Sequence, residues 1–275
     1  MFSFKRSKDP KAEIKKLIGD FELPPFSDIV MRSLSLLRDP ESSLNAIGEV
    51  INYDPALVTS IFKMVNSAAF GLVRHVDNIS QAVALLGRAR LESIVLAHAV
   101  KQSLPKVDEP WFSMSSFWDL AVKKATLARH IAQKFHPATS TQSFTAGMLQ
   151  DVGMVVFASE KKKEYGEVIK MWKTNDNLKL IDIETNTFKF DHQNLGKLMA
   201  EDWMLPEHLI GSISGHHQDG VEPAIKIASY LTDNNLEKSS ELVITKIIKE
   251  FGISIEEATE ILEGALEDAK NVSFA

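Results

Sequence analysis

Apolar residues recur at intervals of three and four along most of the chain, which is the spacing of one face of an α-helix. There is no convincing strand alternation, and no Asn-Gly or Asp-Gly turn stands between β-branched runs. The pattern therefore predicts an all-α protein. In its first part we expect a bundle of short helices over residues 27–37, 42–51, 55–65, 79–86 and 90–102.

Pro105 and Pro110 mark the clearest boundary in the chain, within residues 101–116. Beyond it, helical periodicity resumes over residues 117–135, 144–157, 160–172, 191–203, 206–217, 224–231, 237–251 and 254–269. We accordingly expect a basic segment or helix over 1–22 and one main domain over 23–235, followed by C-terminal helices over 236–275 that pack on it. Within the main domain, a small helical subdomain (23–105) should precede a helical core (111–235).

The stretch FTAGMLQDVGMVVF, residues 144–157, is apolar on every helical face except at Gln150 and Asp151. This pattern predicts a buried helix rather than an amphipathic one at the surface. A buried carboxylate is costly unless it is compensated, so Asp151 requires a charged partner, a metal ion or a proton.

Composition narrows the class of protein. The 275 residues are 44% hydrophobic and 25% charged, as in ordinary soluble domains, and the net charge of −6 argues against general nucleic-acid binding. The absence of cysteine rules out disulfides and thiolate metal sites. No secretory signal and no membrane-spanning stretch is visible, so we expect a cytoplasmic protein without membrane insertion.

Three histidines and two aspartates are the candidate metal ligands. His192 falls in the first turn of its predicted helix, where the helix dipole favours the neutral imidazole that binds metals. His216 and His217 end another helix, and Asp233 closes a third. Together with Asp151 they would suit zinc, iron, manganese or nickel. The competing interpretation is that these residues only cap helices and turns.

The motifs LPP, DPALVTSIFKMVNSAAFG, ISQAVALLG, FTAGMLQDVG and DHQNLGKLMAEDWMLPEHLIGSISGHH occur in this order between Leu23 and Asp233. In this arrangement the chain resembles the HDOD proteins, which are bacterial signalling modules related to the HD-domain metal-dependent phosphohydrolases. The resemblance implies an HD-domain-like helical core behind the N-terminal subdomain. It also implies a role in signal transduction.

The resemblance further implies which metal ligands are missing. The first metal-binding histidine of catalytic HD domains appears as Leu120, and the His-Asp pair appears as Gln150-Asp151. His192, His216, His217 and Asp233 fall at the positions of later ligands. The Gly-Tyr-Pro element of the related HD-GYP phosphodiesterases is also absent, since Gln-Asp-Gly-Val-Glu-Pro follows His217. We therefore predict no catalytic residues and no cofactor, with a divalent transition metal as the alternative.

Two functions remain open at this point. The first is a non-enzymatic regulatory module that binds a signalling protein or a small signalling molecule, since no receiver, cyclase or kinase pattern accompanies it. The second is a metal-dependent phosphohydrolase with a reduced site. An intermediate case is a structural pairing of Asp151 with His216 or His217. Asn66 and Ser67 belong to the most distinctive HDOD segment, and we expect them to hold a turn or to contact a ligand or partner.

Overall fold

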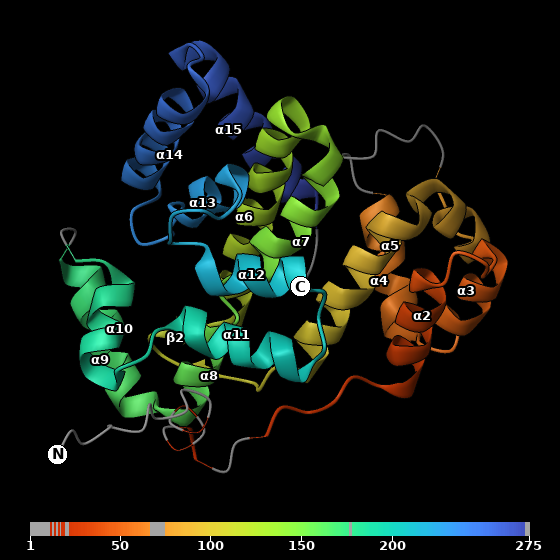
Figure 1. The fold of residues 1–275 in the computed structure, drawn as a ribbon, viewed down its shortest axis with the longest axis horizontal. Helices are drawn as coiled ribbons and strands as arrows, with labels where there is room; N and C mark the ends of the chain where they lie inside the picture. The colour runs from red at the N-terminus through yellow and green to blue at the C-terminus, as the bar shows by residue number, and fades with distance from the viewer. Residues whose placement is uncertain are drawn as a thin grey trace, which may run out of the picture.

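The computed structural model describes residues 22–66, 75–175 and 178–272, together with residues 12, 14, 16, 18 and 19. This part of the chain is helical almost throughout, which confirms the all-α prediction (Figure 1). Its only strands are β1 (Asp108–Glu109) and β2 (Phe112–Ser113), which form a two-residue antiparallel pair. The longer helices are α2 (Asp28–Arg38), α3 (Leu44–Ile51), α4 (Pro55–Val65), α5 (Ile79–Ser103), α6 (Met114–Phe135), α7 (Ser140–Leu149), α8 (Gly153–Glu160), α9 (Lys162–Thr174), α10 (Leu180–Phe188), α11 (His192–Asp202), α12 (Glu207–Gly215), α13 (Pro223–Ser229), α14 (Leu236–Phe251) and α15 (Ile255–Asn271).

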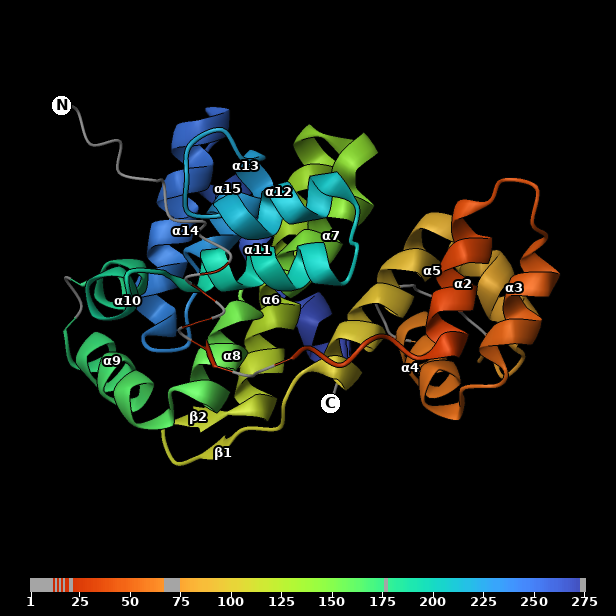
Figure 2. The ribbon, with the colours of Figure 1, turned by 60° about the horizontal axis from the view of Figure 1, so that its bottom comes forward.

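The helices form a smaller lobe and a larger body (Figures 1 and 2). In the smaller lobe, α2, α3 and α4 pack against α5, and α5 then reaches the larger body, where it packs on α7. The larger body is built around α6, which contacts α7, α13 and α15. No helix in the described ranges is both long and apolar enough to cross a membrane.

Local sequence accounts for the boundaries of the first helices. Ser43 accepts a hydrogen bond from the amide of Ala46 and caps α3, while Asp54 caps α4 ahead of Pro55 at its first position. Serine and aspartate are favoured at the N-cap, and proline is favoured at the first helical position. Gly87 has φ 68° and divides α5 into two helical segments, where the sequence predicts a break between two helices. Only glycine adopts this backbone conformation without strain.

Asn66, at the end of α4, has a structural role. Its side-chain amide donates to the carbonyl of Val76 (2.8 Å) and accepts from the amide of Val76 (2.7 Å). Both polar atoms of the side chain therefore hold the backbone that leads into α5. This supports the interpretation that Asn66 holds a turn, whereas its contact with a ligand or partner stays a prediction. Ser67 lies outside the described residues.

His98 on α5 is buried, with 4% of its surface exposed. Its Nδ1 lies 3.2 Å from the Ser60 hydroxyl and its Nε2 lies 3.8 Å from Asp54 Oδ2. Burial lowers the pKa of His98, and the charge of Asp54 opposes this only in part. The unfolded chain therefore binds a proton at this residue more readily than the folded chain does, so stability is lost as the pH falls below about 6.5.

We expect the free energy of unfolding to fall less steeply on acidification in a His98→Gln variant than in the wild type. One group contributes at most about 1.4 kcal/mol per pH unit. Urea unfolding of both proteins at pH 7.5 and 5.5 measures the difference. Equal pH dependence of the two proteins would show that His98 is not kept neutral by the fold.

Candidate functional site

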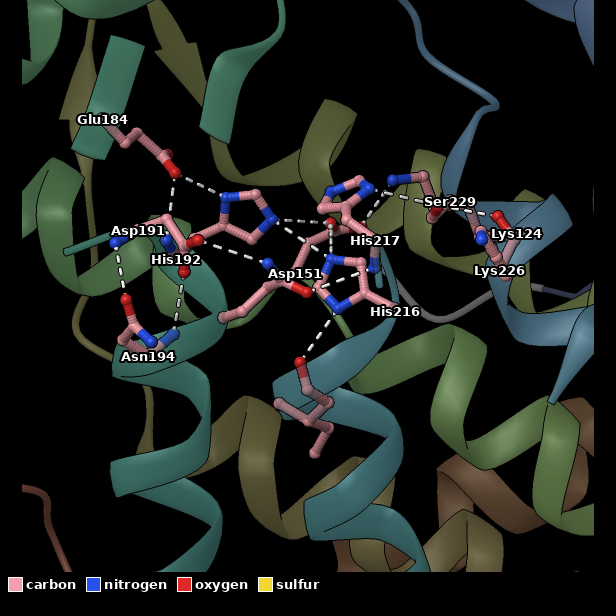
Figure 3. A network of polar contacts seen from close by, with 12 residues as sticks. Lys124, Asp151, Glu184, Asp191, His192, Asn194, His216, His217, Lys226 and Ser229 are labelled. Carbon is pink, nitrogen blue, oxygen red and sulfur yellow. Dashed lines mark hydrogen bonds and ion pairs between the residues drawn. The ribbon is translucent and has the colours of Figure 1, made fainter. Parts of the chain in front are cut away.

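Asp151 has a charged partner inside the protein. The Lys124 ammonium lies 2.6 Å from Asp151 Oδ2, and the two residues are 4% and 7% exposed. Figure 3 shows Asp151 near the middle of the polar network, with Lys124 labelled to its right. Of a charged partner, a metal ion and a proton, the structure shows the charged partner, a lysine, at Oδ2. The other oxygen of Asp151, Oδ1, faces two histidines.

Close packing of α6 against α7 brings this pair together. A Cβ atom added at Gly147 would lie 2.9 Å from both the Cα of Ala125 and the carbonyl oxygen of Lys124, so the two helices meet at a distance that only glycine allows. Lys124 lies one turn after Leu120 on α6, and its side chain therefore points toward the same region as the missing first histidine would.

Asp151 itself lies in a break between helices. The sequence predicts one helix over 144–157, and this boundary is wrong: α7 ends at Leu149 and α8 begins at Gly153. Hydrogen bonds from Val152 N to Leu149 O (3.2 Å) and from Met154 N to Asp151 O (2.9 Å) tighten the turn between them. The turn redirects the chain, so that α8 packs beside α11, which carries His192.

The other oxygen of Asp151 faces two histidines. Oδ1 lies 3.5 Å from His216 Nε2 and 3.7 Å from His192 Nε2, and these two nitrogens are 3.1 Å apart. His217 completes a group of four residues that each offer one ligand atom within 4.8 Å of the others. The structure thus brings together four of the five predicted ligands, while their binding of a metal stays a prediction.

Hydrogen bonds fix the orientation of both imidazoles. His192 Nδ1 lies 2.7 Å from Glu184 Oε2, and His216 Nδ1 lies 2.9 Å from the carbonyl oxygen of Ile213. A carboxylate and a carbonyl oxygen only accept hydrogen bonds, so both Nδ1 atoms donate. In the neutral rings both Nε2 atoms therefore carry lone pairs that face each other. A positive charge, either a proton or a metal ion, is needed between them.

Glu184 is the acceptor at the base of this network and is fully buried. Besides the His192 ring, it accepts hydrogen bonds from the His192 backbone amide (3.0 Å) and from the Tyr165 hydroxyl (2.7 Å). Burial, and then the neighbouring charge of Glu184, raise the pKa of Tyr165 well above its usual value, so Tyr165 remains a donor. Glu184 thereby holds both the backbone and the ring of His192.

His217 takes part more loosely and is half-buried. Its backbone amide donates to Gln193 Oε1 (3.1 Å), and its Nδ1 lies 3.3 Å from the Ser229 hydroxyl. Gln193 thus ties the residue after α12 to the start of α11. His217 faces His192 and His216 from the open side of the cluster (Figure 3).

The environment separates the proton affinities of the cluster. Burial raises the pKa of Asp151, but the Lys124 charge and then His216 outweigh burial, and the pKa lies well below its usual value. Burial lowers the pKa of His192, but Glu184 raises it more, to above the usual value. Burial lowers the pKa of both His216 and His217. Without a metal ion, these opposite directions favour His192 rather than His216 as the donor in the contact between the two Nε2 atoms.

The remaining candidates lie outside this group. Asp233 is exposed and is not one of the four clustered ligands. It lines a cavity that opens above the cluster. Leu120 also lines the cavity and offers no ligand atom. Gln150 is fully buried, and among the described residues neither its Oε1 nor its Nε2 has a hydrogen-bond partner. Its amide therefore contributes nothing to the cluster, in contrast to Asp151 beside it.

The donor atoms fit one divalent cation in their spacing. Ligand atoms around a tetrahedral zinc ion with bonds of about 2.0–2.1 Å lie about 3.3 Å apart, and the three separations here are 3.1, 3.5 and 3.7 Å. The contacts to Glu184 and the Ile213 carbonyl are those that orient metal-binding histidines. The charge of the site suits a divalent cation less well than the spacing does, because Lys124 already neutralises Asp151, the only carboxylate among the four donor residues.

A cavity of about 740 Å³ opens above the cluster. Lys124, Asp151, His192 and His217 line its inner end, whereas His216 is buried behind them. The volume is that of a pocket for a small molecule. The cluster is therefore accessible from outside through this cavity.

Sequence reasoning missed two residues of the site, Lys124 and Glu184. Both lie on helical faces that are otherwise apolar: Lys124 between Ala121 and Ala125, and Glu184 between Leu180 and Phe188. A charged residue on the buried face of a helix was the signal that could have identified them. Lys124 was overlooked because it stands beside Lys123, which is only half-buried, and α10 was not predicted.

Comparison with known proteins agrees with this fold. The model of the HDOD domain family matches residues 23–219. An uncharacterized protein of Treponema pallidum (strain Nichols) is 26% identical over 197 residues, which are 71% of this chain and 38% of that protein. The chain thus spans less than two fifths of the length of that relative.

Two solved structures share the architecture. An HDOD domain protein of unknown function from Geobacter sulfurreducens superposes with a TM-score of 0.75 at 22% identity, over 96% of each chain. A candidate phosphohydrolase from Shewanella amazonensis SB2B superposes with a TM-score of 0.73 at 21% identity, over 95% of this chain and 98% of that one. These likenesses show the fold, and the family match extends over most of the sequence. The chain therefore belongs to the HDOD domain family.

Proposed function

We propose that the chain is a bacterial signal-transduction module whose buried cluster does not hydrolyse phosphoesters, and which acts by binding a small signalling molecule or a partner protein. The observation that carries the proposal is the ion pair of 2.6 Å between Lys124 and Asp151. The proposed setting is the cytoplasm, and with a net charge of −6 the module is not expected to bind nucleic acid.

A hydrolytic metal centre has requirements that the residues of this cluster do not meet. Activation of water at neutral pH takes a cation with an open coordination position, held by carboxylate and imidazole ligands. Here Lys124 neutralises the carboxylate of Asp151, and Leu120 offers no ligand atom. The buried amide of Gln150 has no hydrogen-bond partner among the described residues. The remaining residues form a network that is nearly satisfied by hydrogen bonds and ion pairs, as in a structural core.

A hydrolysis assay tests this proposal. Purified protein, with Mn²⁺, Mg²⁺, Fe²⁺ or Zn²⁺ added in turn, is incubated with bis(p-nitrophenyl) phosphate and with cyclic di-GMP. We expect no product above the level of an Asp151→Asn variant purified in parallel. Turnover that requires added metal and is lost in Asp151→Asn would overturn the proposal.

A second candidate is a phosphohydrolase with a single metal ion, and the observation in its favour is the 3.1–3.7 Å spacing of the three donor atoms. Asp151, His192 and His216 would hold the ion, and Glu184 would fix the His192 ring. The chemistry supplied by such an ion is the activation of water. Under this alternative, a His216→Ala variant would lose both bound metal and turnover together.

We favour the non-enzymatic function because the charge of Lys124 acts directly against cation binding. The spacing of the donors is equally compatible with the protonated His192, which donates to His216 without any metal (3.1 Å). Family membership supports signalling in general terms and does not decide between the two candidates.

A further inference from the structure

The cavity above the cluster has the size and the lining of a ligand site. It measures about 740 Å³ and lies between the segment from β2 into α6, the end of α9 with the described residues at the start of α10, and the segment from α13 into α14. Sites for small molecules are typically mostly apolar clefts with a few polar groups at fixed positions. The cavity has both features.

Aromatic side chains form the apolar walls. Trp111, Phe117, Trp172 and Tyr230 line the cavity from four different segments, and each is half-buried. The first three also pack against the main hydrophobic core, and Tyr230 packs against a second one. Each ring therefore lies partly against a hydrophobic core and partly at the cavity. Such surfaces favour a planar, apolar ligand.

The charged residues favour an anion. Lys173, Lys179 and Lys238 lie at the exposed rim, on α9, before α10 and on α14, and Asp233 is the only carboxylate there among the described lining residues. At the inner end, Lys124 and Asp151 neutralise each other. With the histidines left out, the described lining residues therefore carry a formal charge of +2, four lysines against two aspartates, in a chain of net charge −6. A local excess of one charge in a cleft attracts ligands of the opposite charge.

We propose that this cavity binds a planar aromatic anion, that is, an aromatic body carrying a phosphate, carboxylate or sulfonate group. The aromatic body lies between the Trp111 and Trp172 side of the cavity and Tyr230, and the anionic group lies toward Lys173 and Lys179. His217 and Ser229 at the inner end offer neutral hydrogen-bonding groups to the body of the ligand. This inference builds on the proposed function, in which the ligand is bound and not cleaved.

A matched pair of fluorescent probes tests the proposal. 8-Anilinonaphthalene-1-sulfonate is an aromatic anion built on a planar naphthalene, and N-phenyl-1-naphthylamine has the same aromatic body without the sulfonate. Titrations are made in buffer with EDTA, so that metal plays no part. We expect the anion to bind at one site per chain and at least tenfold more tightly than the neutral probe.

Charge reversal at the rim locates the site. The double variant Lys173→Glu, Lys179→Glu should weaken binding of the anionic probe at least tenfold and leave the neutral probe unchanged. The matched control is Lys163→Glu, Lys170→Glu, which reverses two exposed lysines of α9 that do not line the cavity. Urea unfolding of both variants verifies that they are folded. Equal effects of the two double variants, or equal binding of the two probes, would overturn the proposal.

The two proposals fail in different ways in these experiments. If neither probe binds, the cavity is not a site for aromatic anions, and the absence of phosphoester hydrolysis is unaffected. If p-nitrophenyl phosphate, a third aromatic anion, displaces the sulfonate probe and is also cleaved in the presence of metal, the ligand class stands and the non-enzymatic function fails. Displacement without cleavage supports both.

Discussion

A Lys124→Met variant is expected to bind a divalent transition metal at least 100-fold more tightly than the wild-type protein does. Methionine preserves the length and the apolar stem of lysine but removes the charge that lies 2.6 Å from Asp151. The donor atoms on the other side of the carboxylate, His192 Nε2 and His216 Nε2, are not touched by this change. The variant thus isolates the effect of one positive charge on the cluster.

Electrostatics sets the size of this effect. A dication at one carboxylate oxygen and an ammonium at the other would lie about 5 Å apart, where they repel each other by several kcal/mol at an effective dielectric constant of about 20. Each 1.4 kcal/mol corresponds to about tenfold in affinity. Even after screening by the shared carboxylate, about 3 kcal/mol remains, which corresponds to about 100-fold.

Stability gives an independent measure of the same change. Without Lys124, Asp151 is a buried carboxylate that lacks its cation, and we expect the metal-free variant to lose about 3–5 kcal/mol of stability. Added Zn²⁺ or Mn²⁺ should restore much of this loss and should leave the wild type unchanged. Calorimetric titration gives the affinity, and thermal unfolding with and without metal gives the stability.

Lys123→Met is the matched control, because it removes the same charge from the next residue of α6, which is only half-buried and makes no contact with Asp151 in this structure. Its metal affinity and its stability should match those of the wild type. If Lys124→Met binds metal no better than Lys123→Met does, then Lys124 is not what keeps a divalent ion from the cluster.

The second large effect is expected at Gly153, the first residue of α8. A Cβ atom there would overlap the carbonyl oxygen of His192 and lie 2.8 Å from the amide nitrogen of Gly196, so α8 and α11 touch backbone to backbone. Neither backbone segment can retreat cheaply, because α11 also packs on α12. We expect Gly153→Ala to cost about 3 kcal/mol or more, at the upper end of overpacking effects.

Gly211→Ala provides the control, since Gly211 lies in α12 with no atom within 4 Å of an added Cβ. Alanine is favoured over glycine in a helix by about 1 kcal/mol, so this substitution should be neutral or stabilising. Urea unfolding of both variants measures the contrast. A loss below about 1 kcal/mol for Gly153→Ala would show that the two helices are not held at glycine contact, and that His192 is not positioned by it.

Most helices could be predicted because their signals are local. Asp54 followed by Pro55 starts α4, and Asp191 with Asn194 forms a capping box at the start of α11, which places His192 in its first turn. Asp151, His192, His216 and His217 could be selected because polar residues among apolar ones are conspicuous in a sequence. Their convergence within 4.8 Å depends on the packing of α8, α11 and α12, which no local pattern specifies.

The partner of Asp151 could not be predicted for the same reason. Lys124 is 27 residues away, and only the packing of α6 against α7 brings its ammonium to Asp151. The break at Gln150–Val152 was hidden because no proline marks it, and Gln150 and Val152 keep helical backbone angles. Glu184 was missed together with α10, whose short sequence mixes apolar and β-branched residues.

The central claim is that a lysine and a proton, rather than a metal ion, supply the positive charge in this cluster. Elemental analysis of wild-type protein, purified without chelators and then dialysed against micromolar Zn²⁺ and Mn²⁺, tests it most directly. The account predicts well below one transition-metal ion per chain, at the same level as an Asp151→Asn variant. One ion per chain in the wild type, lost in Asp151→Asn, would contradict it.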